Sequence, residues 1–139
     1  MSDNLGKMLN KIKNASLVKH EVVLIPYTVN NYVTLKVLQQ EMFIESINIV
    51  AKKHSLKSSN NTDKYIKVYL KYNEQTKKPF IKNIKRLSKP SLRAYTNYKN
   101  IPQVLNGLGI IIMSTSKGIM TSKEAYRNAI GGELLFSVW

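Results

Sequence analysis

The sequence predicts an α+β protein built from two small domains. Of its 139 residues, 43% are apolar, which suffices for a buried core but limits the chain to one ordinary domain or two small ones. Helical and strand-like periodicities occur in blocks rather than in regular alternation, an order typical of α+β folds. The segment Ser88-Lys89-Pro90 interrupts these periodicities. We therefore expect an N-terminal α-β-α-β-β domain over residues 1–87 and a C-terminal domain of mixed β structure with one short helix over residues 88–139.

The first predicted element is an amphipathic helix. Asp3 or Ser2 can cap its N-terminus, and four apolar residues recur at helical spacing on one face, namely Leu5, Met8, Leu9 and Ile12. A short buried strand over 22–25 follows and stops at Pro26. A second helix is expected from a cap at Asn30 or Asn31 to about Glu41, with an inward face formed by Val33, Val37 and Leu38.

Strands are predicted to complete the N-terminal domain. The first covers 43–50, and the polar segment 52–64 that follows is expected to be a loop. Residues 65–72 alternate in polarity, which places Ile66, Val68 and Leu70 on one face of a second strand. A turn at 73–78 leads to a further strand over 80–86, and we predict that these two strands form a β-hairpin.

The C-terminal domain is expected to be extended up to Tyr98, with a short turn or helix near 102–105. An apolar strand over 110–113 is followed by a turn at 114–118. The pair Thr121-x-x-Glu124 predicts a capped helix N-terminus, and Gly131-Gly132 predicts the helix end. A final strand covers 133–139, with alternating residues on its two faces.

The positive charge of the chain is concentrated in one segment. The whole sequence has 22 Lys and Arg against 8 Asp and Glu, a formal net charge of +14, and residues 52–99 alone hold 14 of the basic and two of the acidic residues. Tyrosines are interleaved with these lysines, including Tyr65, Tyr69 and Tyr95. Such a segment can neutralise phosphates and stack on bases. Charge therefore favours a nucleic acid as partner, with a solvated Lys-rich face as the simpler interpretation.

Several classes of site are excluded or disfavoured. The chain has no Cys, so disulfides, thiolate metal sites and Cys nucleophiles are absent. His20 and His54 lack a second ligand at metal spacing, and Gly107-x-Gly109 lacks the third glycine of a dinucleotide fingerprint. We therefore expect no metal and no cofactor. No apolar run approaches the roughly 20 residues of a membrane span, and no signal peptide is recognisable, so no membrane partner is expected.

The hydroxyl-rich run Ser114-Thr115-Ser116-Lys117-Gly118 is the most distinctive motif. It formally matches the S-x-x-K of acyl-transfer enzymes, but the accompanying S-D-N and K-T-G motifs are missing. Neither an enzyme nor a small-molecule substrate is therefore expected. Three hydroxyls beside a cation and a glycine suit a ribose 2′-OH, a phosphate or a base edge. The alternative is a hydrogen-bonded turn with a purely structural role.

The stretch GLGIIIMSTSKGIMTSKEAYRNAIGGELLFSVW over 107–139 resembles the closing signature of the small-subunit ribosomal protein eight family in its bacterial and organellar form. Arg93, Tyr95 and Ile101-Pro102 upstream, and Asp3, Met8-Leu9, Ile12 and Asn14-Ala15 at the start, also sit where the family pattern places them. The resemblance covers essentially the whole chain and is closest to plastid versions. The A/T-rich codons of its many Lys, Asn and Ile residues agree with such an origin.

The resemblance implies a structural constituent of the small ribosomal subunit. Such a protein attaches to the central domain of small-subunit rRNA, aids assembly and translation, and lies beside other small-subunit ribosomal proteins. The implied location is the ribosome of a plastid (chloroplast) stroma, or otherwise of a bacterial cytoplasm. By resemblance, the residues that meet rRNA or order the surface that does so are Ser114, Thr115, Ser116, Lys117, Gly118, Lys89, Arg93, Tyr95 and Glu133, and Lys11 and Asn14 touch a neighbouring rRNA segment with the loop near 28–31.

The sequence departs from the family pattern at a few positions. Ser91 follows the linker proline where glycine is usual, and Met42 stands where glycine is common. Thr28-Val29-Asn30-Asn31 replaces a basic loop, which weakens the expected N-terminal contact. Three other functions stay open: an extra-ribosomal RNA-binding or mRNA-regulating module, a hydrolase or transferase using the S-x-x-K residues, and a peripheral membrane protein.

Overall fold

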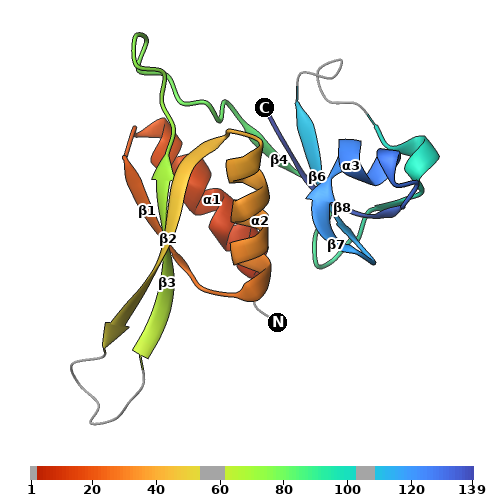
Figure 1. The fold of residues 1–139 in the computed structure, drawn as a ribbon, viewed down its shortest axis with the longest axis horizontal. Helices are drawn as coiled ribbons and strands as arrows, with labels where there is room; N and C mark the ends of the chain where they lie inside the picture. Colours follow the sequence, from red (N-terminus) through yellow and green to blue (C-terminus); the bar gives the residue numbers. More distant parts are fainter. Residues whose placement is uncertain (1–2, 54–61, 103–108) are drawn as a thin grey trace.

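The computed structural model describes residues 3–53, 62–102 and 109–139, which fold into helices and two antiparallel sheets (Figure 1). The predicted α+β class is confirmed. The first half of the chain contains α1 (Asn4–Leu17), β1 (Val22–Pro26), α2 (Val29–Gln40), β2 (Ile44–Lys53) and β3 (Thr62–Leu70). The second half contains β4 (Ile84–Arg86), β5 (Tyr95–Thr96), the 3₁₀ helix η1 (Tyr98–Asn100), β6 (Ile110–Thr115), β7 (Gly118–Thr121), α3 (Ser122–Arg127) and β8 (Gly132–Val138).

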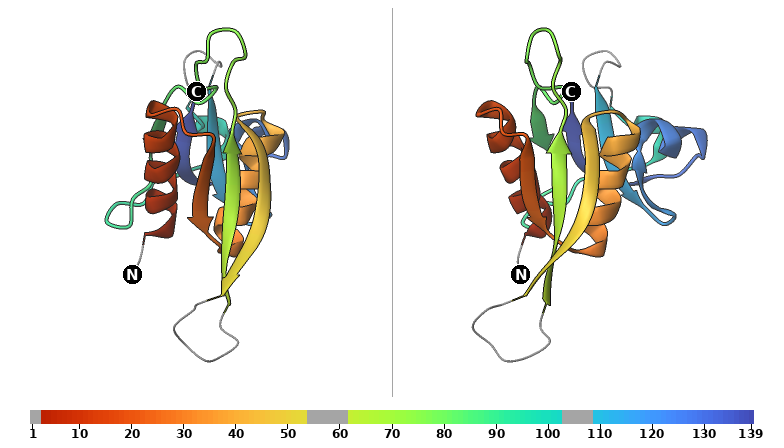
Figure 2. Two further views of the ribbon diagram at one scale, coloured as in Figure 1. Left: turned by 90° about the vertical axis from the view of Figure 1, so that its left-hand side faces the viewer. Right: turned by 60° about the vertical axis from the view of Figure 1, so that its left-hand side comes forward.

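The N-terminal sheet has the strand order β1-β3-β2. Ile66 and Val68 of β3 are fully buried, as predicted, and Val68 lies opposite Val23 of β1 and Ile47 of β2. Helices α1 and α2 cover this apolar face, so that they lie between the N-terminal sheet and the second half of the chain. Figure 2 (left) looks onto the opposite, uncovered face of the sheet.

Helix α1 matches its prediction, whereas α2 begins earlier than expected. Asp3 caps α1 by accepting a hydrogen bond from the Gly6 N–H at 3.2 Å, and Met8, Leu9 and Ile12 are buried. The cap of α2 is Thr28, whose hydroxyl accepts from the Asn31 N–H at 3.0 Å. Asn31 is instead buried inside the first turn and donates to the Pro26 carbonyl. Of the predicted inward face, Leu38 is buried, whereas Val33 and Val37 are only half-buried. Thr34 and Leu35 are buried instead.

The predicted hairpin between 65–72 and 80–86 is wrong. The turn at 73–78 forms, with a hydrogen bond from the Asn73 N–H to the Lys78 carbonyl, but pairing stops at one bridge between Tyr72 and Pro79. The partners of β3 are β1 and β2, and β4 pairs with β8 in the other sheet. Alternation predicts that a segment is a strand but contains no information on its partner, and the strand nearest in sequence is not the partner here.

The C-terminal sheet is built around β8. Its strand order is β4-β8-β6-β7, and β5 also pairs with β8. Because β8 has neighbours on both edges and packing on both faces, all residues from Leu134 to Val138 are buried. The alternation of β8 therefore separates two buried faces. The turn at 114–118 is the connection of a β6–β7 hairpin, which the sequence pattern did not reveal.

Gly131 and Gly132, at the start of β8, have a different function from the one predicted. Thr121 caps α3 as expected, with its hydroxyl accepting from the Glu124 N–H, but α3 ends at Arg127 rather than at Gly131-Gly132. A Cβ on Gly131 would collide with the Thr96 carbonyl, and one on Gly132 with the Ser114 carbonyl. The glycine pair therefore allows β8 to approach the backbones of β5 and β6 closely.

The three α-helices end in the same way. At each end the last carbonyls accept a 6→1 and a 5→2 hydrogen bond, the pattern of a Schellman motif. The residue after the C-cap has a positive φ, and none of these residues is glycine: Lys19 (φ 59°), Met42 (φ 66°) and Ala129 (φ 54°). The family pattern favours glycine at one of these three positions, that of Met42, and the structure gives the physical reason.

The two halves share one hydrophobic core. Leu35 and Leu38 of α2 belong to the same cluster as Ile112 of β6 and Phe136 of β8. The chain changes sheets between β3 and β4, ahead of the expected boundary near 87–90; the division into domains 1–87 and 88–139 stays a prediction. The turn expected near 102–105 lies almost wholly outside the described residues. The loop expected at 52–64 is wrong at both ends, because residues 52–53 extend β2 and residues 62–64 begin β3; its middle lies outside the described residues. No helix in the described part of the chain could cross a membrane.

Candidate RNA interface

The tip of the β6–β7 hairpin presents the middle of the hydroxyl-rich run to solvent. Ser116 and Lys117 are exposed at the turn. The Thr115 hydroxyl donates to the Gly118 carbonyl at 2.8 Å and accepts from the Lys117 N–H at 3.2 Å, and Gly118 has a φ of 109°. Thr115 and Gly118 therefore determine the shape of the turn, while the Ser116 hydroxyl and the Lys117 ammonium are available to a ligand. The structural interpretation of this motif thus suits Thr115 and Gly118, and the binding interpretation suits Ser116 and Lys117.

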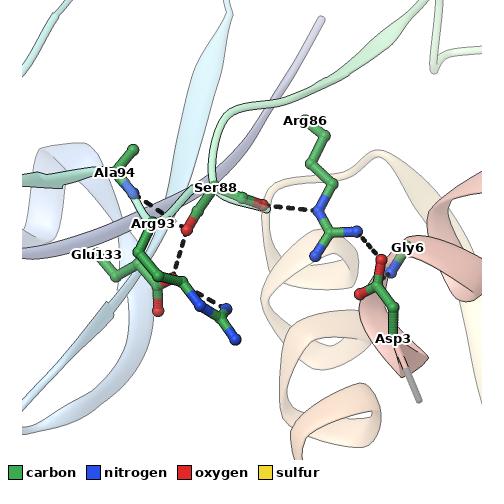
Figure 3. A network of polar contacts seen from close by, with 7 residues as sticks. All are labelled: Asp3, Gly6, Arg86, Ser88, Arg93, Ala94 and Glu133. Carbon is green, nitrogen blue, oxygen red and sulfur yellow. Dashed lines mark hydrogen bonds and ion pairs between the residues drawn. The ribbon is translucent and has the colours of Figure 1, made fainter. Parts of the chain in front are cut away.

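Glu133 connects this hairpin to the segment that follows β4. It lies opposite Ser114 in the β6–β8 register and opposite Tyr95 in the β5–β8 register. Its carboxylate accepts hydrogen bonds from the Ser88 hydroxyl and from Arg93 Nη1, the latter at 3.2 Å (Figure 3). The Ser88 oxygen in turn accepts from the Ala94 N–H at 3.2 Å. Glu133 is thus used internally, and it holds Arg93 at the surface.

The same network reaches the N-terminus of α1. Arg86 Nε donates to the Ser88 carbonyl at 2.7 Å, and Arg86 Nη1 forms an ion pair with Asp3 (Figure 3). The Arg86 guanidinium beside Asp3 holds the pKa of that carboxyl below its usual value, against a smaller opposing effect of burial. A chain of contacts therefore extends from α1 through β4 to β8.

Lys89 and Tyr95 lie in the same segment as Arg93. Lys89 and Leu92 exchange two backbone hydrogen bonds, of 2.9 and 3.0 Å, which close a tight turn with exposed side chains. Tyr95 is 72% exposed. Ser91 of this turn is not among the residues with a positive φ, so the glycine usual in the family is not required here.

A cleft joins this surface to the N-terminus of α2. It has a volume of about 320 Å³, and its lining includes Arg93, Ser114 and Glu133 together with Thr28, Asn30 and Asn31. Thr28 and Asn31 use their side chains to cap and brace α2. The segment 28–31, expected to be a loop, is instead the N-cap and first turn of α2. It lies beside the C-terminal candidates, but the Thr28 and Asn31 side chains already have hydrogen-bond partners.

Lys11 and Asn14 form a separate location. Both are exposed on α1, on the side opposite the buried Met8 and Ile12. Within the described residues, no hydrogen bond or ion pair joins them to the β6–β7 turn. The structure thus groups the C-terminal candidates on one surface and leaves these two apart from it.

Sequence reasoning missed the ion pair of Arg86 with Asp3, whose members are 83 positions apart. No local pattern reports such a long-range contact. Across 3–53, 62–102 and 109–139, no three His, Cys, Asp or Glu side chains gather in a way that could hold a metal ion.

The ribosomal protein S8 family model matches residues 3–139. The chain belongs to the ribosomal protein S8 family. The small ribosomal subunit protein uS8c of Bigelowiella natans is 72% identical to it over 139 residues, 100% of both chains. That of Tupiella akineta is 49% identical over 137 residues, 99% of this chain and 98% of its own. The uS8 protein of Rippkaea orientalis is 41% identical over 138 residues, 99% of this chain and 98% of its own.

Membership of the S8 family confirms the resemblance found in the sequence. The chain is a small-subunit ribosomal protein and not an enzyme, so the S-x-x-K run is not a nucleophilic site. The S8 proteins of Bigelowiella natans and Tupiella akineta are of the plastid type and that of Rippkaea orientalis is cyanobacterial, which confirms the expected plastid assignment. RNA binding is general to the family.

Proposed function

We propose that this S8 chain attaches to the central domain of plastid small-subunit rRNA and supports assembly of the subunit beside other small-subunit proteins. The observation that carries the proposal is the exposed β6–β7 turn, where a free hydroxyl and a cation stand on a rigid hairpin. Hydroxyl and ammonium donors at a fixed spacing suit phosphate, ribose 2′-OH and base-edge acceptors. The net charge of +14 adds sequence-independent attraction to the polyanion.

The residues of the surface divide into contacts and supports. Ser116, Lys117, Arg93, Tyr95 and Lys89 are exposed and are assigned to direct contact with rRNA. Four residues are assigned to positioning, because they act inside the surface through the Thr115 hydroxyl, the Glu133 carboxylate or backbone groups: Thr115, Gly118, Ser114 and Glu133. Lys11 and Asn14 are assigned to a second, weaker contact with a neighbouring rRNA segment.

Replacing Ser116 by Ala tests the assignment. Loss of one buried hydrogen bond to RNA should weaken binding to a central-domain rRNA fragment by about 1–2 kcal/mol, or roughly five- to thirtyfold. The measurement is a filter-binding or anisotropy titration of the full chain over a salt series, with tRNA as competitor. Thr76→Ala is the matched control, because Thr76 is another exposed hydroxyl in a tight turn. Its affinity should equal that of the wild type.

Two results would contradict the proposal. Equal affinity of the Ser116→Ala and wild-type chains would mean that the hydroxyl run serves the turn alone. Competition by tRNA as effective as that by the rRNA fragment would favour the extra-ribosomal module, because a general RNA binder does not distinguish structured RNAs.

A further inference from the structure

A groove on the outer side of the C-terminal sheet is separate from the surface described above. It runs between η1 and α3, which are in contact with each other, and has a volume of about 540 Å³. Ile111 lines it and belongs to a small cluster that includes Met113 and Leu134, whereas Ile112 points into the core shared with α2. The groove therefore lies on the face of the sheet turned away from α2, where Figure 1 shows α3 and η1.

Two tyrosines form part of the groove walls. Tyr98 comes from η1 and Tyr126 from α3, and their ring centroids are 6.2 Å apart with an interplanar angle of 59°. Tyr126 is 62% exposed and Tyr98 is half-buried. An aromatic ring that remains open to solvent beside a groove can stack on a planar ligand.

Cations lie around these rings. Lys99, Lys123 and Arg127 line the groove, and among its lining residues in the described part of the chain none is Asp or Glu. Lys99 Nζ lies 5.9 Å from the Tyr98 ring centroid. Glu124, the nearest acid along α3, is exposed but does not line the groove. The groove is thus complementary to a ligand that combines flat rings with several negative charges.

We propose that this groove binds an unpaired segment of RNA, with a base stacked on Tyr126 and the flanking phosphates held by Lys123 and Arg127. The inference rests on the proposed function only in assuming that the ligand is RNA. Stacking on an exposed tyrosine does not depend on which base is present, so the groove takes single strands with little sequence preference. The β6–β7 turn supplies placement on structured rRNA, and the groove retains a neighbouring unpaired strand.

The test uses the full chain and fluorescein-labelled hexauridylate, an unstructured probe, in anisotropy titrations. Tyr126→Leu should weaken binding about fivefold or more, since it removes the ring, whereas Tyr126→Phe should stay within about twofold. Phe80→Leu is the matched control, because Phe80 is an exposed ring with Lys71 Nζ 4.8 Å from its centroid, outside the groove. Its affinity should not change.

A second variant tests the cations. Replacing Lys123 and Arg127 together by Gln should lower the slope of log affinity against log salt by about 1.4, as expected for two phosphate contacts with a single strand. The control replaces Lys78 and Lys82, which are also exposed, together by Gln. Its slope of log affinity against log salt should equal that of the wild type.

The outcomes separate this proposal from the previous one. Equal binding of hexauridylate by Tyr126→Leu and wild type overturns the groove, even if Ser116→Ala still weakens rRNA binding. Displacement of hexauridylate by a polyglutamate peptide as readily as by unlabelled uridylate would also overturn it, since only charge would then be recognised. If the wild-type chain binds uridylate through Tyr126 but does not prefer the rRNA fragment over tRNA, the proposed ribosomal attachment is contradicted and the proposed groove stands.

Discussion

Ser88 satisfies two partners from a buried position. It is 1% exposed, donates to the Glu133 carboxylate and accepts from the Ala94 N–H. A hydrophobic side chain at this position would leave the Ala94 N–H without this acceptor and the Glu133 carboxylate with the Arg93 hydrogen bond alone. Such losses are costly because both groups are partly removed from water.

Ser88→Ala should therefore lower the free energy of unfolding by about 1–3 kcal/mol, as measured by urea denaturation. Ser137→Ala is the matched control, because Ser137 is also buried but has only a 3.4 Å hydrogen bond to the Lys85 carbonyl. Its effect should be the smaller of the two. If the two variants lose the same free energy of unfolding, the hydrogen bonds of Ser88 to Glu133 and Ala94 contribute no stability beyond packing.

Asp3 couples the stability of the chain to pH. Its pKa in the folded protein is lowered, chiefly by the hydrogen bond from Arg86, so the contribution of the ion pair is present above the ordinary pKa near 3.8. This contribution is lost as the pH falls through the folded pKa, because the protonated carboxyl no longer attracts the guanidinium. About a third of the Asp3 side chain is exposed, which limits its magnitude.

Asp3→Asn isolates this charge, because asparagine caps a helix as well as aspartate does. At pH 7 the variant should unfold with a free energy lower by up to about 1 kcal/mol. The difference in free energy of unfolding between wild type and variant should become smaller as the pH is lowered from 5 to below 3, as followed by urea denaturation at each pH. A difference that does not change with pH would mean that the charge on Asp3 does not contribute to stability.

At the scale of elements, the helix ends depart from the usual residue chemistry. A residue with a side chain in the left-handed region is strained by roughly 1 kcal/mol relative to glycine. Lys19, Met42 and Ala129 adopt this region at the ends of α1, α2 and α3. The motif forms because its two hydrogen bonds satisfy carbonyls that would otherwise lack partners.

Met42→Gly should raise the free energy of unfolding by about 0.5–1 kcal/mol, because little packing is lost from a side chain that is 65% exposed. Glu41→Gly is the matched control, since Glu41 is the adjacent exposed C-cap residue with a φ of −84°. It should leave stability unchanged or lower it. The free energy of unfolding of both variants is measured by urea denaturation. If both variants are more stable than the wild type, the positive φ of Met42 is not the cause of the gain.

Elements with strong local signals were predictable from the sequence, and their pairings were not. The period of Leu5, Met8, Leu9 and Ile12 defines α1, and the Thr121 capping box defines the start of α3. The partner of β3 depends on the burial of the whole sheet, which no short window contains. Similarly, the hydroxyl run indicated a polar site, but only the hydrogen bonds of Thr115 show which residues are available.

At the scale of the whole molecule, the shared core predicts one cooperative transition. Leu35 of α2 is fully buried in the cluster that contains Phe136 of β8. Trp139, the single tryptophan, is held by hydrogen bonds between its backbone and the backbones of Lys82 and Asn83 beside β4. Its fluorescence therefore reports on the C-terminal sheet, while circular dichroism reports on the entire chain.

Leu35→Ala should lower the free energy of unfolding by about 2–5 kcal/mol and shift both signals to the same urea concentration. Val29→Ala, at an exposed position of the same helix, is the control and should change neither signal. A Trp139 transition that stays in place while the dichroism midpoint moves would show that residues 1–87 and 88–139 unfold as separate domains.

The position of β8 also orders events during synthesis of the chain. All strands of the N-terminal sheet have been made once residue 70 is reached, so this sheet can form early. In contrast, β4 and β5 find their partner only in β8, which is translated after every other strand. The nascent polypeptide therefore carries unpaired strand edges until that point. The surface that holds Arg93 and Glu133 is therefore assembled last.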